Sequence, residues 1–275
     1  MKLHANNNFI LFLFEKPFRQ AQLDYFFRGI LLVVFVQLIY YSVNYSFFFS
    51  NSIFAPKPIS GYGLETFLNL FSHPFFLQKE FIGLMVGFVS LAGILLGYLR
   101  TFFTFLLWLT ICNIHNRLYF SLTGGDILIN QLLFWLIFVS ETKKQKKYKL
   151  IITNFAFLAL VIQISFVYFF SAWYKWLDPA WVKGEALGYI GQLPAYSNSV
   201  GQFLLSFPIV YYPLTWLVLI FQTLFPLIVF IKPFKRHFIW LGIIIHVGIA
   251  LTMDLYFFSG TMIVSYLLFT EVDGN

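Results

Sequence analysis

Eight apolar runs follow one another along the 275-residue chain, and each spans or nearly spans the thickness of a lipid bilayer. Only 11% of the residues are charged, whereas a soluble domain carries about 25%. A backbone in contact with lipid must satisfy its own hydrogen bonds, as a helix does. The pattern therefore predicts an all-α, polytopic membrane bundle of about eight transmembrane helices. The runs lie at about 26–48, 81–99, 101–120, 127–140, 149–172, 211–231, 238–257 and 259–270.

Basic residues predict the orientation of this bundle in the cell membrane, because cytoplasmic loops are enriched in Lys and Arg. The sequence KKQKKYK at 143–149 separates the fourth and fifth runs and is expected on the cytoplasmic side. Eight spans threaded from there place both termini, Arg100 and the segment KPFKRH at 232–237 on that side. We expect a cytoplasmic and interfacial segment over 1–25, one transmembrane domain over 26–270, and a cytoplasmic tail over 271–275.

Three connections then reach the outer face, at about 49–80, at the turn SLTGGD over 121–126, and at about 173–210. The last is the longest and carries three prolines between short amphipathic stretches. Long connections in a compact domain are more often functional than idle. We therefore expect an interfacial loop and the candidate site on the outer face.

Lys175 stands at the end of the fifth run among Trp173, Tyr174 and Trp176, just ahead of an Asp-Pro turn and the sequence WVKG. An amine in an aromatic setting loses water, which favours its neutral form, and the neutral amine can accept a proton. Lysines at helix ends also extend to the lipid headgroups, where aromatic belts lie in any case. The local pattern leaves both interpretations open.

Polar residues gather where the third run ends, in the sequence NIHNRLYFSLTGGD. An ionisable group within a span costs roughly 2.5–3.5 kcal/mol on insertion scales, so its presence needs a reason. Helical spacing places Asn113 on one face with Asn116 and Arg117, while His115 points elsewhere. Across the turn, Arg117 could pair with Asp126. Both a hydrogen-bond network between helices and a binding site explain this group.

His246 lies near the middle of the seventh run, in IIIHVGI, where water cannot readily satisfy its ring nitrogens. A lone buried histidine often serves only as a hydrogen-bonding residue. In the middle of the membrane, a functional role for His246 is given the same weight as this structural role. Asp254, one to two turns further on, is its expected neighbour. The five histidines include no pair at metal-ligand spacing, and the single cysteine excludes cysteine-based centres, so no metal site is predicted.

Three features occur in order: the NR…GGD turn, the segment VYFFSAWYKWLDPAWVKGEALGY, and a late span with IIIHVGIAL. Together they resemble the horizontally transferred transmembrane domain, the membrane portion of vitamin K-dependent γ-glutamyl carboxylases, over about residues 20–270. In that family a lysine deprotonates reduced vitamin K, and the resemblance implies this role for Lys175, although Trp176 is an extra residue in the pattern. A family histidine falls closest to His115.

The resemblance implies an enzyme that oxidises or epoxidises a membrane quinol, either reduced vitamin K or another, with Lys175 as general base. The carboxylases' lumenal region has no counterpart here, so glutamate carboxylation is not expected. Candidate catalytic residues are Lys175, His115 and His246, and candidate substrate-binding residues are Arg117, Asp126, Trp173 and Trp181.

The alternative is a non-catalytic membrane factor for the maturation, export or immunity of a small peptide, or one that binds lipid or peptide. Expected partners are membrane lipid and a quinone or small peptide. Basic residues cluster at the ends of the apolar runs despite the net charge of +7, which argues against nucleic acid as a partner.

Overall fold

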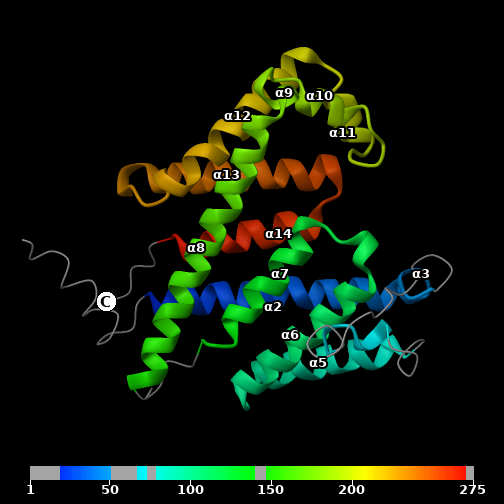
Figure 1. The fold of residues 1–275 in the computed structure, drawn as a ribbon, viewed down its shortest axis with the longest axis vertical. Coiled ribbons are helices and arrows are strands. Elements are labelled where there is room, and N and C mark those ends of the chain that lie inside the picture. The colour runs from blue at the N-terminus through cyan, green and yellow to red at the C-terminus, as the bar shows by residue number, and fades with distance from the viewer. Residues whose placement is uncertain (1–18, 51–66, 73–78, 140–146, 271–275) are drawn as a thin grey trace, which may run out of the picture. The chain divides into compact units, whose positions relative to one another are not determined.

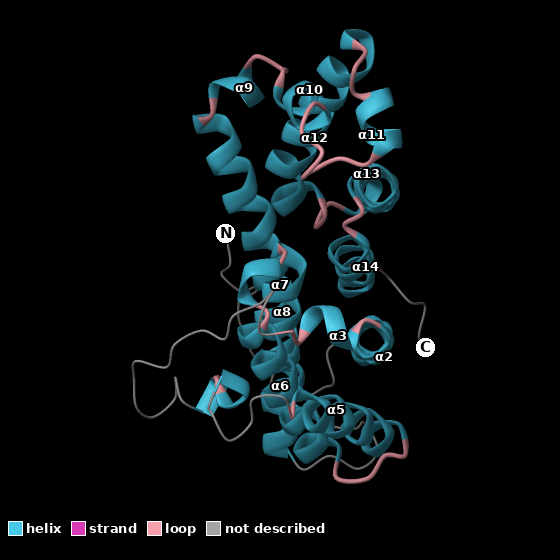
Figure 2. Cartoon of the chain, turned by 90° about the vertical axis from the view of Figure 1, so that its right-hand side faces the viewer, coloured by secondary structure: helices cyan, strands magenta, loops and turns pink. Residues whose placement is uncertain are grey.

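The computed structural model describes residues 19–50, 67–72, 79–139 and 147–270, and every regular element in those ranges is a helix (Figures 1 and 2). The predicted all-α class is therefore confirmed for the described part of the chain. The chain forms two compact units, Met1–Leu158 and Ala159–Asn275, here called the N-terminal and the C-terminal unit.

In the N-terminal unit, α6 packs between α5 and α7, and α2 contacts both α5 and α7. Phe26, Ile30, Val34 and Leu38 recur every fourth residue along α2 and are fully buried, as expected of the core-facing stripe of a helix. The elements are α2 (Gln20–Val43), α3 (Tyr45–Phe48), η1 (Leu70–Ser72), α5 (Glu80–Leu95), α6 (Arg100–Arg117), η2 (Tyr119–Ser121), α7 (Gly124–Leu136) and the first part of α8 (Lys147–Leu177).

In the C-terminal unit, α10 packs on α12, α11 on α13, and α13 on α14. Proline stands in the first or second position of α9, α12 and α13, where its missing N–H costs nothing. Besides the rest of α8, the elements are α9 (Pro179–Val182), α10 (Ala186–Gly191), α11 (Ser199–Leu204), α12 (Pro208–Ile228), α13 (Lys232–Met253), α14 (Tyr256–Ser265) and η3 (Tyr266–Leu268).

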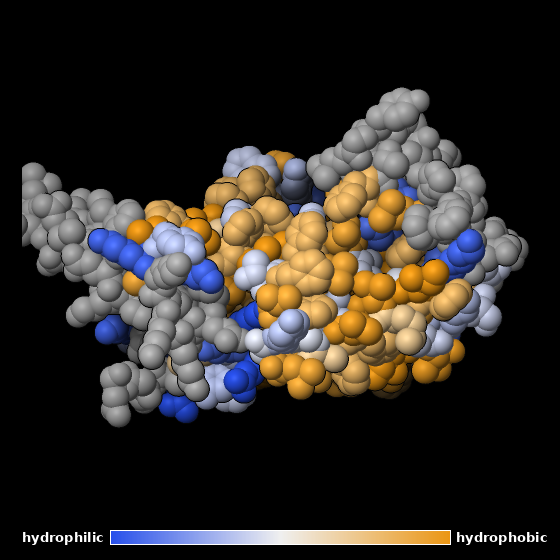
Figure 3. Space-filling view, turned by 90° about the horizontal axis from the view of Figure 1, so that it is seen from below, coloured by the Kyte–Doolittle hydropathy of each residue, from blue (hydrophilic) through white to orange (hydrophobic). Residues whose placement is uncertain are grey.

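Four of the described helices are long and apolar enough to cross a membrane, namely α2, α8, α12 and α13. Each of the eight predicted apolar runs coincides with a helix, but α5 and the stretch Tyr256–Leu268 are shorter apolar segments. Hydrophobic side chains dominate much of the molecular face in Figure 3, as expected of helices that meet lipid.

Some predicted segments lie outside the described residues. These are residues 1–18 of the expected interfacial segment, most of the connection at 49–80, residues 143–146 of the lysine run, and the tail at 271–275.

Asn198 joins the connection before α12 to the end of α13. Its backbone N–H donates to the Thr252 carbonyl (3.0 Å), and its Nδ2 donates to the Leu251 carbonyl (3.0 Å) and to Oδ1 of Asp254 (2.8 Å). Its Oδ1 accepts from the N–H of Gly201 (3.0 Å) and so caps α11. The last carbonyls of a helix have no donor within that helix, and at the end of α13 the N–H groups of Asn198 donate to two of them.

Asn198→Ala is expected to lower the free energy of unfolding by about 1–2 kcal/mol, because it removes a helix cap and two further hydrogen bonds. Thermal unfolding in detergent at neutral pH measures this effect. Asn198→Asp keeps the cap but brings a second carboxylate to Asp254, and is expected to fall between alanine and wild type. Wild-type stability of the alanine variant would contradict the structural role.

The same contact makes part of the stability pH-dependent. Hydrogen bonds from Asn198 and, second, from the Tyr256 hydroxyl hold the pKa of Asp254 below its ordinary value. A carboxyl with a lowered folded-state pKa stabilises the protein above its unfolded pKa of about 4, and this contribution is lost as the pH falls through the folded-state value. Asp254→Asn should therefore reduce the loss of stability as the pH falls below about 4, the ordinary pKa of an aspartate.

Candidate functional site

Lys175 lies on the last turn of α8 and is half-buried. Its Nζ donates to Oγ of Ser171 at 2.8 Å and lies over the ring of Trp181, 4.8 Å from the centroid. The Ser171 hydroxyl in turn donates to Oε1 of Gln222 on α12 at 3.2 Å. No carboxylate in the described ranges lies within ion-pair distance of Lys175. Its amine is therefore held by a hydroxyl and an aromatic face.

A local turn places Trp181 at this amine. Asp178 is the N-cap of α9, where its Oδ1 accepts from the N–H of Ala180 at 2.9 Å, and Pro179 is the first helical residue. The chain thus ends α8 and starts α9 within two residues, which returns Trp181 to Lys175. The predicted Asp-Pro turn is present.

The neighbouring tryptophans point in different directions. Trp173 is 55% exposed and stacks on Phe169, with ring centroids 6.4 Å apart. Two residues correspond to about 200° around a helix, so Trp173 and Lys175 lie on opposite sides of α8. Trp176 donates from Nε1 to Oγ1 of Thr223 on α12 at 2.9 Å. Of the two tryptophans expected to bind substrate, only Trp181 contacts Lys175.

His246 is buried on α13 and belongs to a chain of hydroxyl groups. Its Nε2 lies 2.9 Å from the hydroxyl of Tyr168 on α8, which lies 2.5 Å from the hydroxyl of Tyr266. Each hydroxyl has one hydrogen, so Tyr266 donates to Tyr168 when Tyr168 donates to His246. Nδ1 of His246 has no partner among the described residues. The expected neighbour Asp254 instead bonds to Asn198 and Tyr256.

Tyr168, Ser171 and Lys175 share one face of α8, because they follow at positions i, i+3 and i+7. Tyr168 and Lys175 are separated by about 10 Å along the helix axis. Contacts from Tyr168 to Phe225 and from Ser171 to Gln222 show that this face is turned to α12. This face of α8 in the C-terminal unit thus meets two polar groups, the buried His246 at Tyr168 and, further along the helix, the half-buried Lys175.

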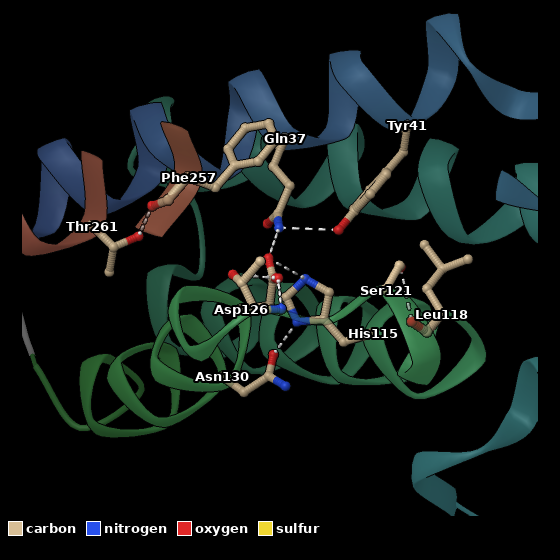
Figure 4. A network of polar contacts seen from close by, with 10 residues as sticks. Gln37, Tyr41, His115, Leu118, Ser121, Asp126, Asn130, Phe257 and Thr261 are labelled. Carbon is tan, nitrogen blue, oxygen red and sulfur yellow. Dashed lines mark hydrogen bonds and ion pairs between the residues drawn. The ribbon is translucent and has the colours of Figure 1, made fainter. Parts of the chain in front are cut away.

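A second cluster lies in the N-terminal unit, around His115 (Figure 4). His115 is fully buried, and its Nδ1 lies 2.8 Å from Oδ1 of Asn130 on α7. An amide oxygen only accepts, so Nδ1 carries the hydrogen in the neutral ring and Nε2 presents a lone pair. Nε2 is 3.9 Å from Oδ1 of Asp126, beyond hydrogen-bond distance, and has no partner among the described residues.

Asp126 is the third residue of α7 and forms a capping box with Thr123, since its Oδ2 accepts from the N–H (2.7 Å) and the hydroxyl (2.8 Å) of Thr123. Its Oδ1 accepts from Nε2 of Gln37 on α2 at 2.6 Å, and the same Nε2 donates to the Tyr41 hydroxyl at 3.1 Å. Oε1 of Gln37 is buried without a partner among the described residues. The cluster therefore presents two unpaired acceptors, at His115 and Gln37, near one carboxylate.

Arg117 binds a different carboxylate from the one expected. Its Nε donates to Oε1 of Glu80 at 3.2 Å, and both side chains are fully buried. Glu80 is the first residue of α5, and its Oε2 also accepts from the Tyr45 hydroxyl at 3.4 Å. The predicted pair with Asp126 is wrong, because the carboxylate of Asp126 caps its own helix and binds Gln37.

Asn113 and Asn116 share a face, as their spacing predicts. Nδ2 of Asn113 donates to the Phe67 carbonyl (3.2 Å), and Nδ2 of Asn116 donates to the Leu68 carbonyl (2.7 Å). His115 faces α7 instead. The polar residues at the end of α6 thus serve two purposes, since one face holds the backbone near residue 67 and the other carries the histidine.

No protein-family model, curated protein or solved structure matches this chain. The candidate sites therefore depend on the chemistry of their own residues. Within the described residues there is no group of three or more His, Cys, Asp or Glu side chains that could hold a metal ion.

Several partners in these clusters were not singled out from the sequence: Gln37, Glu80, Asn130, Ser171 and Tyr266. Gln37 interrupts an apolar run, FVQLIYY, and this is the same signal that pointed to His246. Glu80 stands at the boundary of a run, where a charge is ordinary, so the sequence carries no signal for its burial.

Proposed function

We propose that this is a multi-pass membrane protein of about eight spans, with cytoplasmic termini and Lys175 near the outer face. The length of α8 supports a full span whose two ends lie on opposite sides of the membrane. Its 31 residues extend about 46 Å, which exceeds the roughly 30 Å of the hydrocarbon core. With Lys147 and Lys149 at the cytoplasmic surface, Lys175 reaches the opposite headgroup region.

Lys175 is proposed to act as a general base on a lipid-soluble quinol, as the resemblance to the carboxylase membrane domain implies. The observation that carries the proposal is a half-buried primary amine with a hydroxyl and an indole as neighbours and no carboxylate partner among the described residues. A carboxylate would hold the amine in its charged form, which cannot accept a proton. The residues fit a quinol, since Trp181 offers a flat apolar surface and Ser171 a polar contact.

In the proposed reaction, Nζ of Lys175 takes a phenolic proton and leaves a quinolate anion. The resulting ammonium group stays hydrogen-bonded to Ser171. Reaction with molecular oxygen then converts quinol and O₂ into quinone epoxide and water, with one oxygen atom in each product. The electrons that reduce oxygen come from the quinol.

The two histidines receive different proposed roles. His246 bonds to Tyr168 through Nε2, so we propose that it positions this tyrosine instead of contacting substrate. His115 presents a lone pair at Nε2, which suits the acceptance of a proton better than the stabilisation of an oxyanion, because an oxyanion needs a donor. Arg117, Asp126 and Trp173 stay proposed substrate-binding residues, and Trp173 lies on the side of α8 opposite Lys175.

The experiment supplies a reduced, prenylated naphthoquinone and oxygen to the protein in lipid nanodiscs, and measures epoxide by chromatography. We expect product from wild type and loss of product in Lys175→Ala. Lys183→Ala is the matched control, because Lys183 is an exposed lysine eight residues further on. Equal product formation by Lys175→Ala and wild type would contradict the proposal.

A binding function without catalysis is the second candidate, and the same unpaired amine favours it. A cation without a carboxylate partner can pair with an anionic group of a small peptide or a lipid. This function predicts that Lys175→Ala weakens binding of an acidic amphipathic peptide to nanodiscs that hold the protein, while no epoxide is formed by wild type.

A further inference from the structure

The connection between α8 and α12 contains a long stretch without charge. No Asp, Glu, Lys, Arg or His occurs from Ala186 to Phe207. At the average composition of soluble domains, a water-exposed stretch of this length would carry about five charged residues. The environment of this stretch therefore differs from bulk water.

Large apolar side chains in the stretch point away from the protein. Tyr196 is 63% exposed, Val200 54%, Phe203 65% and Phe207 45%. An accumulation of exposed apolar side chains marks a surface that meets lipid or another protein. The carboxylates that contact the stretch, Glu185 and Asp254, bond to Tyr189 and Asn198.

α10 lies beside α12 and not beyond its end. The N–H of Leu187 donates to Oγ1 of Thr215 at 3.2 Å, and Thr215 lies seven residues into α12, about 10 Å along its axis. A Cβ added at Gly188 would come within 3.0 Å of the Tyr211 ring, so the backbone of α10 touches α12 directly. Figure 1 shows α9 and α10 next to the end of α8 and the start of α12.

α11 is fixed in the same way to the end of α13. A Cβ added at Gly201 would lie 2.3 Å from the Thr252 carbonyl oxygen, so only glycine permits this approach. Asn198 bonds to the carbonyls of Leu251 and Thr252. The connection is therefore held at the level of the helix ends, and does not project from them.

Several polar side chains in this stretch bond to the protein's own backbone. Nε2 of Gln202 donates to the Ser197 carbonyl at 2.8 Å, and Oγ of Ser206 donates to the Phe203 carbonyl at 2.7 Å. Asn198 is used in full by α11 and α13. Internal pairing of this kind is what a segment away from water requires.

We propose that residues 186–207 are embedded in the interfacial region of one leaflet, with membrane lipid as the partner of their exposed apolar side chains. The proposal rests on the proposed function, in which α12 and α13 span the membrane. α12 has 21 residues and extends about 31 Å, close to the roughly 30 Å of the hydrocarbon core. A segment packed beside its first two turns therefore faces lipid, and its tyrosines match the aromatic belt of that region.

The test uses the single cysteine of the chain. Cys112→Ala gives a cysteine-free background, into which Phe203→Cys is introduced and labelled with the polarity-sensitive fluorophore nitrobenzoxadiazole. In phosphatidylcholine vesicles with iodide on both sides, we expect blue-shifted emission, strong quenching by nitroxide-bearing lipid and weak quenching by iodide. Lys183→Cys, in the charged turn after α9, is the matched control and should be quenched by iodide.

Phe203 was chosen because its side chain is exposed, so the substitution leaves the core unchanged. A label at Phe203 that iodide quenches as strongly as the label at Lys183 overturns the inference. A label that neither quencher reaches also overturns it, because a protein surface then covers this face. Ile220→Cys, on the exposed face of α12, distinguishes failure of the interfacial segment from failure of the proposed membrane span of α12. If lipid nitroxide quenches the label at Ile220 but not at Phe203, only the interfacial segment is refuted; if it quenches neither, the spanning of α12 fails as well.

Discussion

Replacing Lys175 with alanine is expected to lower the rate of quinol oxidation by about 10²–10⁴-fold, the range that a positioned general base contributes. The hydroxyl of Ser171 and the indole of Trp181 remain in this variant, but neither accepts a proton from a phenol at neutral pH. The measurement is kcat/KM for the reduced naphthoquinone in nanodiscs. Small primary amines added to Lys175→Ala should restore part of the activity, because they supply the missing base.

Lys175→Arg distinguishes the two candidate functions. A guanidinium group stays charged and cannot act as a base, although it still pairs with anions. The catalytic function therefore predicts an arginine variant as inactive as the alanine variant, whereas the binding function predicts that arginine retains peptide binding. An arginine variant with wild-type oxidation would contradict the general-base role.

The helices could be predicted from the sequence because each apolar run is a local property of the chain. All eight runs coincide with helices, although only α2, α8, α12 and α13 satisfy the length and hydropathy expected of a span. The surroundings of Lys175 were predicted in part for the same reason. The cap at Asp178 and the start of α9 at Pro179 are encoded within a few residues.

Helical geometry also separates Trp173 from Trp181. A residue two positions from Lys175 lies on the far side of the helix, whereas Trp181 returns to Lys175 through the turn. This distinction was available from helical spacing alone. The lack of charge over 186–207 is likewise a local property of the sequence, whereas the packing of α10 beside α12 is not.

Partners distant in sequence could not be predicted. Arg117 had an acidic residue nearby at Asp126 but binds Glu80, 37 positions away. Helix packing decides which carboxylate reaches a buried cation, and the apolar pattern of these helices does not specify their pairing. Gln37 reaches Asp126 over 89 positions for the same reason.

Replacing Glu80 with alanine is expected to lower the free energy of unfolding by about 3–5 kcal/mol, the range for removal of one partner from a buried ion pair. Both side chains are fully buried, so the charge of Arg117 would stay in the core after the Glu80 carboxylate is removed. The loss of an acceptor for the Tyr45 hydroxyl adds to the effect. Thermal unfolding in detergent is the measurement, and a shift near zero would contradict it.

Two comparisons separate the buried charge from other effects of the substitution. Asp24 pairs with Arg100 at 3.9 Å in the same unit, with side chains 33% and 15% exposed, and Asp24→Ala should cost less than about 1 kcal/mol. The double variant Glu80→Ala, Arg117→Met should recover much of the stability lost in Glu80→Ala, because methionine removes the charge of Arg117 from the core. If the double variant were as unstable as the sum of its single variants, packing around Glu80, and not the charge of Arg117, would account for the loss.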